Sequence, residues 1–509
     1  MNSRLKMTVK NAFWSYFSMA ISLVMQFASR TVFIYCLGKE FLGINGLFTN
    51  LLGVLSFAEL GIGTAINFSL YKPVSDGDIE KIKAYMYYYK WAYRIIAIFI
   101  AVLGLILLPF LDLFITDPGN VGDVRVYYII YLFNTVTSYF VSYKYSLANA
   151  EQKSYIYTNI NTICNFVILT AQMIALLIWK NFLVYLLIAA IFGLIQKVFT
   201  SIYFNKLYPY LRDKTVTKLS KSDKHILITK IKAMVIHKIG DVSVHQTDNI
   251  IVSSFISTVL VGVISNYTMI IGAIQNCVNI LFNSVIGSLG NLVATESKEK
   301  QYQIFKDYRF IGFWIFGFCA VALATLINPF ITLWLGKDLL LEPAIINIIL
   351  IDFYMIGQRI CINNFKSSAG VVEQDRYVAF LQAVVNLVVS IILAKKIGLI
   401  GVYIGTLVQG LLASILKPVL SYKVLFNISS WYYFKDSAKY AVAVLISYFT
   451  CQLCSNFILS SVNILNFIIM ILLTVIIPNL IFTLLFFRTE EFKYFYSKIA
   501  SVFKKIKNR

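Results

Sequence analysis

The sequence predicts an all-α integral membrane protein of about 14 transmembrane helices, arranged as two parallel six-helix lobes around a central cavity with two extra C-terminal helices. Three observations predict this fold class: an apolar composition, a one-sided distribution of basic residues and an internal repeat. Of the 509 residues, 59% are hydrophobic and 14% are charged, and the mean hydropathy is +0.75. A soluble globular protein carries about 25% charged residues, so the composition excludes that class.

The apolar stretches are long enough to cross a membrane, because a span needs about 20 residues. They are continuous and do not alternate with period two, which predicts helices and not barrel strands. The first stretch follows a basic N-terminus, but it is long, contains Arg30 and shows no convincing cleavage site, so we interpret it as a retained span. The predicted spans are residues 12–36, 42–69, 88–116, 124–146, 156–179, 182–204, 233–257, 259–291, 310–335, 344–365, 376–394, 397–421, 437–458 and 463–487.

The net charge of +21 is first of all a topology signal. Most of the 45 lysines and arginines lie in the predicted loops and span ends on one side of the membrane, and few lie on the other side. The positive-inside rule therefore predicts a multi-pass protein of the plasma membrane with both termini in the cytoplasm. The basic excess favours contact with membrane lipids, and we expect no nucleic acid partner.

An internal repeat relates the two halves of the chain. The segment RTVFIYCLGKEFLGINGLF at 30–48 aligns with NIIVSSFISTVLVGVISNY at 249–267, which pairs Gly43 with Gly262. Two further pairs, PFLDLFI with PFITLWL and EQKSY with EQDRY, follow in the same order at a nearly constant offset of about 220 residues. Each copy holds six predicted spans, an even number, so the copies are expected to run parallel and to be related by an axis along the membrane normal.

The repeat determines the expected domain organisation. The longest hydrophilic stretch joins the two lobes and is basic, so we expect it in the cytoplasm. The C-terminus is basic and amphipathic, and we expect it to lie on the inner membrane surface. The expected segments are 1–204 for the N-lobe, 205–232 for the linker, 233–421 for the C-lobe, 422–487 for two further spans and 488–509 for the tail.

The loops argue against an enzyme. A membrane glycosyltransferase or polymerase would need a sizeable outer loop or a cytoplasmic catalytic domain, and the predicted loops are too short for either. The sequence contains neither a Walker lysine motif nor HExxH. The three histidines and seven scattered cysteines are expected to be interior side chains and not metal ligands. We therefore predict no catalytic residue, metal site or cofactor, although transport can be coupled to an H⁺ or Na⁺ gradient.

Three basic residues within predicted spans are candidate ligands for phosphate: Arg30, Lys238 and Arg359. A charged side chain at mid-bilayer costs roughly 2.5–3.5 kcal/mol even on a lenient scale, so a buried one is a candidate for function. The planar guanidinium matches phosphate oxygens, and a cationic interior favours an anionic cargo such as phosphate on a lipid carrier. The alternative for Arg30 is a structural pair with an acid on another helix.

Glu59 is a candidate for ion coupling or gating. It lies in AELGIGTAINF, where Gly61 and Gly63 predict either a bend in the second span or a close approach of another helix. A carboxylate beside such a bend can carry a proton or a cation, or it can pair with Arg94. Both interpretations follow from the sequence.

The seventh predicted span is the most polar. Asp241, His245 and Asp248 fall at i, i+4 and i+7, and Lys238 continues that face. A face this polar is expected to line water or a partner helix. Because Arg30 aligns with Asn249 in the repeat, Asp248 is expected at the same depth, and a pair between them would hold the outer side closed in one state.

Two further spans carry polar candidates. The amides of Asn276, Asn279 and Asn283 form a stripe at i, i+3 and i+7, which either joins helices or contacts sugar hydroxyls. Asp352 and Arg359 lie two turns apart on one side of a helix. They are expected either to pair through a third group or to face the cavity separately.

Several of these segments resemble Wzx-type polysaccharide and oligosaccharide flippases of Gram-positive bacteria, in the multidrug/oligosaccharidyl-lipid/polysaccharide (MOP) exporter superfamily. The resemblance covers about residues 5–490. It is carried by GKEFLGINGLFTNLLGVLSFAELGIGTAINFSLYKPV, by TDNIIVSSF followed by VGVISNY, by NPFITLWLG and by EQDRY.

The resemblance implies a flippase that moves oligosaccharide repeat units on undecaprenyl diphosphate from the inner to the outer leaflet, for capsule or exopolysaccharide assembly. It implies alternating access without ATP hydrolysis, and glycosyltransferases or a polymerase of the same pathway as partners. Lipid II flippases of the superfamily use cavity arginines for the diphosphate, which implies that role for Arg30. The alternatives are a teichoic acid precursor flippase and an exporter of drugs or small metabolites, whose cavity would be dominated by acids and aromatics.

Overall fold

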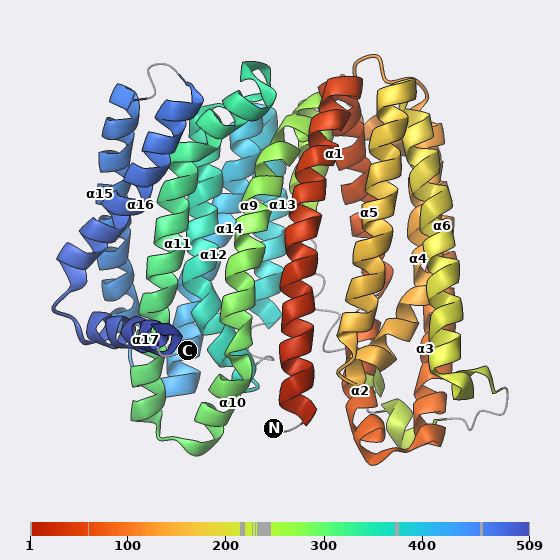
Figure 1. Ribbon diagram of the computed structural model, residues 1–509, viewed down its shortest axis with the longest axis horizontal. Coiled ribbons are helices and arrows are strands. Elements are labelled where there is room, and N and C mark those ends of the chain that lie inside the picture. The colour runs from red at the N-terminus through yellow and green to blue at the C-terminus, as the bar shows by residue number, and fades with distance from the viewer. Residues whose placement is uncertain are drawn as a thin grey trace. The chain divides into compact units, whose positions relative to one another are not determined.

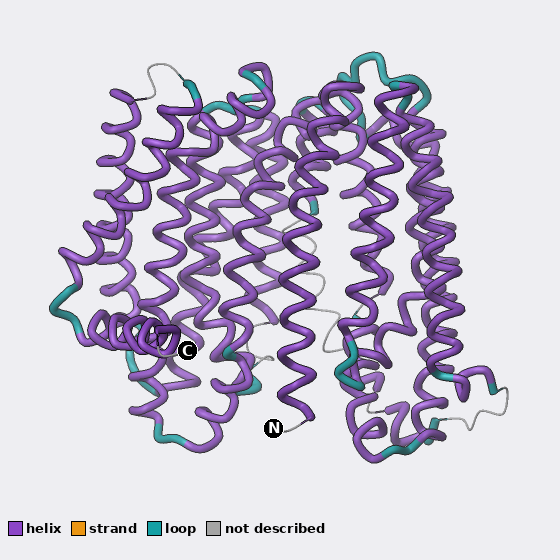
Figure 2. The backbone as a smooth tube through the Cα atoms, in the orientation of Figure 1, coloured by secondary structure: helices purple, strands orange, loops and turns teal. Residues whose placement is uncertain are grey.

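The described residues of the computed structural model, which are 3–59, 61–213, 219–225, 227–229, 231, 246–371, 376–458 and 462–507, form helices joined by short loops. Figure 2 shows no strand among them. The predicted all-α fold class is therefore confirmed. The chain divides into two compact units, Met1–Ser265 and Asn266–Arg509.

Eleven of the described helices are long and apolar enough to cross a membrane, which makes the chain a multi-pass membrane protein. The predicted number of 14 spans is not confirmed, for three reasons. Predicted spans 12–36 and 42–69 fall largely on one long helix, Trp14–Leu55. The helix over predicted span 124–146 is too polar to be counted, and most of predicted span 233–257 lies outside the described residues.

The first unit packs long helices around an aromatic core that contains the buried Phe48, Tyr128 and Phe182 (Figure 1). Its described helices are α1 (Ser3–Leu55), η1 (Ser56–Glu59), α2 (Ile62–Asp76), α3 (Ile79–Leu107), η2 (Leu108–Leu113), α4 (Val124–Ala150), α5 (Ser154–Trp179), α6 (Phe182–Leu207), η3 (Pro209–Arg212) and α8 (Thr247–Phe255). The first turns of α9 (Thr258–Ser284) also belong to this unit.

Polar side chains begin several of these helices. Asp78 accepts a hydrogen bond from the Lys81 amide, and Asn181 accepts one from the Val184 amide. The first four amides of a helix have no partner within the helix, and a side-chain oxygen at the N-cap satisfies one of them. The loop residues thus determine where α3 and α6 begin.

Two glycines interrupt the helices of the first two predicted spans. Within α1, Gly38 has a φ of 87° and kinks the helix. After α1, the short η1 and Gly61, with a φ of 71°, separate α1 from α2. Only glycine adopts such angles without a steric penalty from a Cβ. The predicted bend beside Glu59 is therefore present as a break in the helix.

Backbone hydrogen bonds attach α8 and the start of α9 to the loop after η2. The Thr116 amide donates to the Ser253 carbonyl (3.1 Å), and the Thr258 amide donates to the Thr116 carbonyl (2.8 Å). These bonds join segments about 140 residues apart in sequence. They explain why the first unit extends to Ser265.

The second unit is built around α11, the most buried of its long helices. Its π-helical turn η6 continues α14 directly. The described helices that follow α9 are α10 (Ile286–Thr295), α11 (Lys298–Leu335), η4 (Lys337–Leu339), α12 (Pro343–Ser368), α13 (Arg376–Ile397), α14 (Leu399–Ser421), η6 (Tyr422–Phe426), α15 (Trp431–Ile458), α16 (Ile464–Phe486) and α17 (Glu490–Lys507).

The predicted amphipathic tail forms α17, which runs across one end of α11 (Figure 1). Its Phe492 and Phe495 rings lie 5.7 Å and 5.4 Å from the Trp314 ring of α11, measured between ring centroids. The apolar face of α17 is therefore covered, in part, by the second unit itself. Its predicted place on the inner membrane surface stays a prediction.

Candidate functional site

Arg30 lies in α1 with a neutral hydrogen-bond partner. Its Nη1 donates to the Ser265 hydroxyl (2.8 Å), and the side chain is close enough to Tyr185 to interact with it electrostatically. Among the residues that the structure describes, no carboxylate lies within 4.0 Å of the guanidinium. The structure shows no Arg30–Asp248 pair, so this pair stays a prediction for another state of the protein. Within the described part of the chain, the positive charge of Arg30 has no acidic counter-charge in contact with it.

Glu59 ends a chain of hydrogen bonds at the break between α1 and α2. Ser146 donates to the Tyr89 hydroxyl (3.2 Å), Tyr89 donates to the Tyr93 hydroxyl (3.1 Å), and Tyr93 donates to the Glu59 carboxylate. The alternative partner, Arg94, lies instead over the Trp91 ring, 5.5 Å from its centroid. Each hydroxyl in the chain donates towards the carboxylate.

Three predicted site residues, Lys238, Asp241 and His245, lie outside the described residues. Asp248 is in the first turn of α8. The predicted polar face of the seventh span therefore stays a prediction except for the position of Asp248.

The asparagine stripe lies on α9. Asn276 and Asn283 are exposed, whereas Asn279 accepts a hydrogen bond from Gln275 (2.9 Å). Two of the three amides thus present polar groups at the surface of the second unit.

Asp352 and Arg359 of α12 both approach Gly410 of α14. Arg359 Nη1 donates to the Gly410 carbonyl and to the Ser414 hydroxyl (2.8 Å). A Cβ on Gly410 would lie 2.6 Å from Asp352 Oδ1, which shows how closely the carboxylate approaches the backbone. Arg359 is only 6% exposed. Arg359 therefore joins α12 to α14 in this conformation, and a pairing of Asp352 with Arg359 through a third group stays a prediction.

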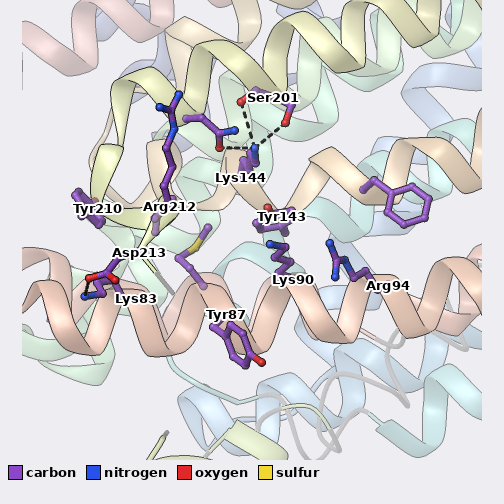
Figure 3. Close-up of a pocket in the computed structure, with 14 residues that line it drawn as sticks. Lys83, Tyr87, Lys90, Arg94, Tyr143, Lys144, Ser201, Tyr210, Arg212 and Asp213 are labelled. Atoms are coloured by element: carbon purple, nitrogen blue, oxygen red, sulfur yellow. Dashed lines mark hydrogen bonds and ion pairs between the residues drawn. The ribbon is translucent and has the colours of Figure 1, made fainter. Parts of the chain in front are cut away.

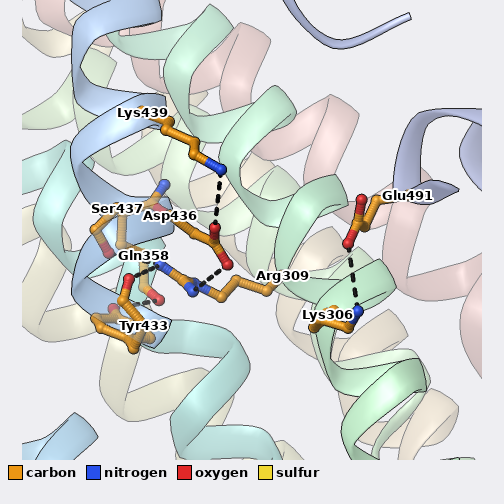
Figure 4. Close-up of polar contacts among 8 residues, drawn as sticks. All are labelled: Lys306, Arg309, Gln358, Tyr433, Asp436, Ser437, Lys439 and Glu491. Carbon is orange, nitrogen blue, oxygen red and sulfur yellow. Dashed lines mark hydrogen bonds and ion pairs between the residues drawn. The ribbon is translucent and has the colours of Figure 1, made fainter. Parts of the chain in front are cut away.

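A second buried arginine, Arg309 of α11, was not among the predicted site residues. Its Nη2 donates to the Tyr433 carbonyl (2.8 Å) and to the Ser437 hydroxyl (2.6 Å), and Asp436 lies 3.8 Å away (Figure 4). The guanidinium also lies 3.7 Å from the centroid of the Tyr433 ring. These contacts join α11 to α15, which is a structural role.

A basic cavity of about 680 Å³ in the first unit was also missed by the sequence analysis. It lies between α3, α4, α6 and η3, and Figure 3 shows basic side chains from all of these elements except α6. The cations that line it are Lys83, Lys90, Arg94, Lys144 and Arg212. The sequence holds a partial signal, because the three residues of α3 fall at i, i+7 and i+11 on one helical face. The other two come from distant segments, so no local pattern could add them.

Comparisons with known proteins show the fold. No family model matches the chain, and no curated protein matches it in sequence. The chain is similar to the structure of the lipid II flippase MurJ in an inward closed conformation, with a TM-score of 0.64 and 19% identity over 94% of this chain and 98% of that one.

Two multidrug transporters are similar as well. An inward-facing multidrug resistance MATE family transporter of the MOP superfamily has a TM-score of 0.59, with 14% identity over 79% of this chain and 93% of that one. The Vibrio cholerae MATE transporter VcmN has a TM-score of 0.58, with 15% identity over 84% of this chain and 98% of that one. The chain therefore has the fold that MurJ and the MATE transporters of the MOP superfamily share.

Proposed function

We propose that the protein is a flippase that moves undecaprenyl-diphosphate-linked oligosaccharide repeat units from the inner to the outer leaflet of the plasma membrane. The observation that carries the proposal is Arg30, a guanidinium in a membrane helix with a hydroxyl as its only hydrogen-bond partner among the described residues. The fold supports it, since the likeness to a lipid II flippase extends over 94% of the chain. In this proposal the protein is a transporter and not an enzyme.

The diphosphate binds to Arg30 in the proposed mechanism. A guanidinium has five N–H donors, and the bond to Ser265 uses one of them, so donors remain for phosphate oxygens. The exposed amides of Asn276 and Asn283 offer donors and acceptors to sugar hydroxyls. The Arg30 guanidinium replaces part of the water that a charged headgroup would lose in the hydrocarbon, where an isolated charge is costly. Alternating access then releases the lipid to the outer leaflet.

Glu59 is the proposed coupling group for an H⁺ or Na⁺ gradient. It lies at a helix break, where backbone groups are not all used within a helix, and the chain from Ser146 through Tyr89 and Tyr93 ends on its carboxylate. A change in the protonation or ion occupancy of Glu59 would change the contact that holds η1 against α3. Arg359 is buried in α12 and would contact cargo only after a rearrangement, so the diphosphate is assigned to Arg30.

A second candidate function is an exporter of small organic cations. The specific observation that favours it is the surroundings of Glu59, since Tyr89, Tyr93 and Tyr139 place aromatic rings around an acid. An acid among aromatic faces binds a cation. In the flippase proposal the same group binds the coupling ion and not the cargo.

The test is a lipid extraction from cells depleted of the protein. We expect complete undecaprenyl-linked repeat units to accumulate on the cytoplasmic side, as quantified by mass spectrometry with a leaflet-selective probe. Wild-type protein should reverse the accumulation and Arg30→Ala should not. Arg125→Ala is the matched control, because Arg125 is 54% exposed and pairs only with Asp112 at a helix end.

The outcomes separate the candidates. Full rescue by Arg30→Ala would show that the arginine is structural and would leave the proposal without its main support. If a teichoic acid precursor accumulates in place of a repeat unit, the cargo is that precursor and the proposed mechanism still applies. Altered tolerance to cationic drugs without any lipid accumulation would favour the exporter.

A further inference from the structure

The basic cavity reaches into the membrane from the end of the first unit that the charge pattern places in the cytoplasm. Along α3 it extends from Lys83 to Arg94, eleven residues, which is roughly 16 Å along the helix axis. Two aromatic side chains at its edge, Tyr87 and Phe140, are 51% and 46% exposed. Exposed rings near the end of a membrane-spanning helix are expected to lie at the lipid interface. The cavity is thus lined by cations and bordered by exposed aromatic side chains.

Two of its five cations form ion pairs or hydrogen bonds with neighbouring side chains and backbone groups. Lys83 pairs with Glu80 (2.8 Å) and Asp213 (2.9 Å), which neutralise its charge. Lys144 is 5% exposed and donates to the Ser201 carbonyl (3.2 Å) and hydroxyl (2.7 Å). It also donates to the Asn205 side chain (2.7 Å), so these three acceptors are neutral groups (Figure 3). The charge of Lys144 is therefore fixed in place but not neutralised.

The other three cations, Lys90, Arg94 and Arg212, have no carboxylate within 4.0 Å in the part of the chain that the structure describes. In Figure 3, Lys90 and Arg94 point from α3 towards Lys144. Burial raises the pKa of the neighbouring Tyr210 to about 12, so its phenol stays neutral and does not offset these charges. Four uncompensated positive charges thus surround one cavity.

We propose that this cavity binds the phosphate or diphosphate headgroup of a lipid from the inner leaflet. Charge-assisted bonds from arginine and lysine to phosphate oxygens are among the strongest hydrogen bonds in proteins, and two guanidinium or ammonium groups can share one diphosphate. A volume of about 680 Å³ lies within the range of small-molecule sites. The aromatic border gives the attached acyl or isoprenyl chain a path to the bilayer.

The lipid source follows from the position of the cavity. A soluble anion would meet the same cations, but it would not use Tyr87 and Phe140, whose rings are exposed where a hydrocarbon chain would leave the site. The proposal stands apart from the proposed cargo, because any phosphate-bearing lipid of the inner leaflet satisfies it. A binding measurement on purified protein therefore tests it even if the flippase proposal fails.

The experiment measures binding of farnesyl diphosphate to the full-length protein in detergent, by native mass spectrometry and by thermal shift, with inorganic pyrophosphate and phosphatidylcholine as the other two probes. All variants are made in an Arg30→Ala protein, so that the diphosphate ligand of the proposed function does not contribute to binding. In that protein we expect K90Q/R94Q to bind farnesyl diphosphate about tenfold more weakly or worse, since it loses two charged donors. R212Q changes an exposed residue of η3 and should weaken binding without affecting folding. The matched control is K395Q/K396Q, which removes two exposed cations elsewhere.

Each outcome decides the proposal. A lipid headgroup site is supported if the cavity variants weaken farnesyl diphosphate binding and the control variant does not. Millimolar pyrophosphate should then fail to displace the farnesyl diphosphate. If pyrophosphate binds as tightly as farnesyl diphosphate and displaces it completely, the cavity is a site for free diphosphate. That result would overturn the proposal that the ligand is a lipid. Unchanged binding in R212Q and K90Q/R94Q, both with the melting temperature of the Arg30→Ala protein, would overturn the cavity as the site.

Discussion

At the residue scale, the arginines within membrane helices differ in the groups that accept their hydrogen bonds. Arg309 and Arg359 donate to backbone carbonyls and serine hydroxyls of neighbouring helices in the second unit, and both are at most 6% exposed. Arg30 is partly exposed and donates to one hydroxyl. Bonds from a deeply buried guanidinium to groups of a neighbouring helix indicate a structural role, whereas spare donors in a partly exposed side chain indicate a ligand site.

Arg309→Ala should destabilise the protein by about 2–4 kcal/mol, because it removes two buried hydrogen bonds to a charged donor and the contact with the Tyr433 ring. The check is the midpoint of thermal unfolding in detergent. Lys306→Gln is the control. Its pair with Glu491 (3.6 Å) is partly exposed, so it should cost less than about 1 kcal/mol. Equal losses in the two variants would contradict the structural role of Arg309.

The sequence could identify buried ionisable residues but not their partners. Arg30 and Glu59 stand out in apolar stretches, and the structure describes both. Their contacts, Ser265 and Tyr93, lie 235 and 34 residues away, so no local pattern connects them. The same limit explains why the basic cavity was missed, since Lys144 stands 50 residues beyond Arg94 in the chain.

At the element scale, close backbone approach depends on glycines that the repeat alignment had already paired. Gly262 of α9 lies against α1, and a Cβ there would be 2.6 Å from the Lys39 carbonyl oxygen and 2.7 Å from the Gly43 nitrogen. Backbone atoms cannot move aside as a flexible side chain can. The two segments therefore approach closely only because both positions lack side chains.

Gly262→Ala should lower the stability by about 1–3 kcal/mol, the usual cost of overpacking. Gly272→Ala on the same helix is the matched control, since nothing lies within 4 Å of its added Cβ. It should be neutral or stabilise the helix by up to about 1 kcal/mol. Thermal unfolding of the two variants side by side is the measurement. A stable Gly262→Ala protein would show that α1 and α9 separate more easily than the structure indicates.

Helix interruptions were only partly predictable. The spacing of Gly61 and Gly63 predicted a bend, and Gly61 indeed breaks the helix with a φ of 71°. The expected boundary between the first two spans, residues 37–41, contains Gly38, where the backbone leaves the helical conformation and kinks α1. A lone glycine in an apolar stretch has several uses, and only its backbone angles distinguish them.

At the scale of the whole molecule, the charge pattern predicts which loops face the cytoplasm. With the seven native cysteines replaced, Asp117→Cys should react with a membrane-impermeant thiol reagent in intact cells, and Lys221→Cys should react only after permeabilisation. Both residues are exposed. Labelling of Lys221→Cys in intact cells would invert the predicted topology.

The overall class was predictable because composition and charge act along the whole chain. An all-helical membrane fold follows from long apolar stretches, and the structure agrees with it. The comparisons show that this fold is similar to that of MurJ and the MATE transporters. The number of spans was less certain, because the helix Val124–Ala150 is rich in tyrosine and serine and has low hydropathy despite its length. A helix can be long enough to cross a membrane without being strongly apolar. A span that neighbouring helices shield from lipid needs a lower hydropathy.

The contact between Gly43 and Gly262 limits the sequence variation that both segments can tolerate. A Cβ on Gly43 would lie 2.2 Å from the Thr258 carbonyl oxygen, and a Cβ on Gly262 would lie 2.6 Å from the Lys39 carbonyl oxygen. Both obstacles are backbone atoms, so a substitution at one glycine cannot be offset by a smaller side chain at another position. Each glycine is therefore restricted independently of the other.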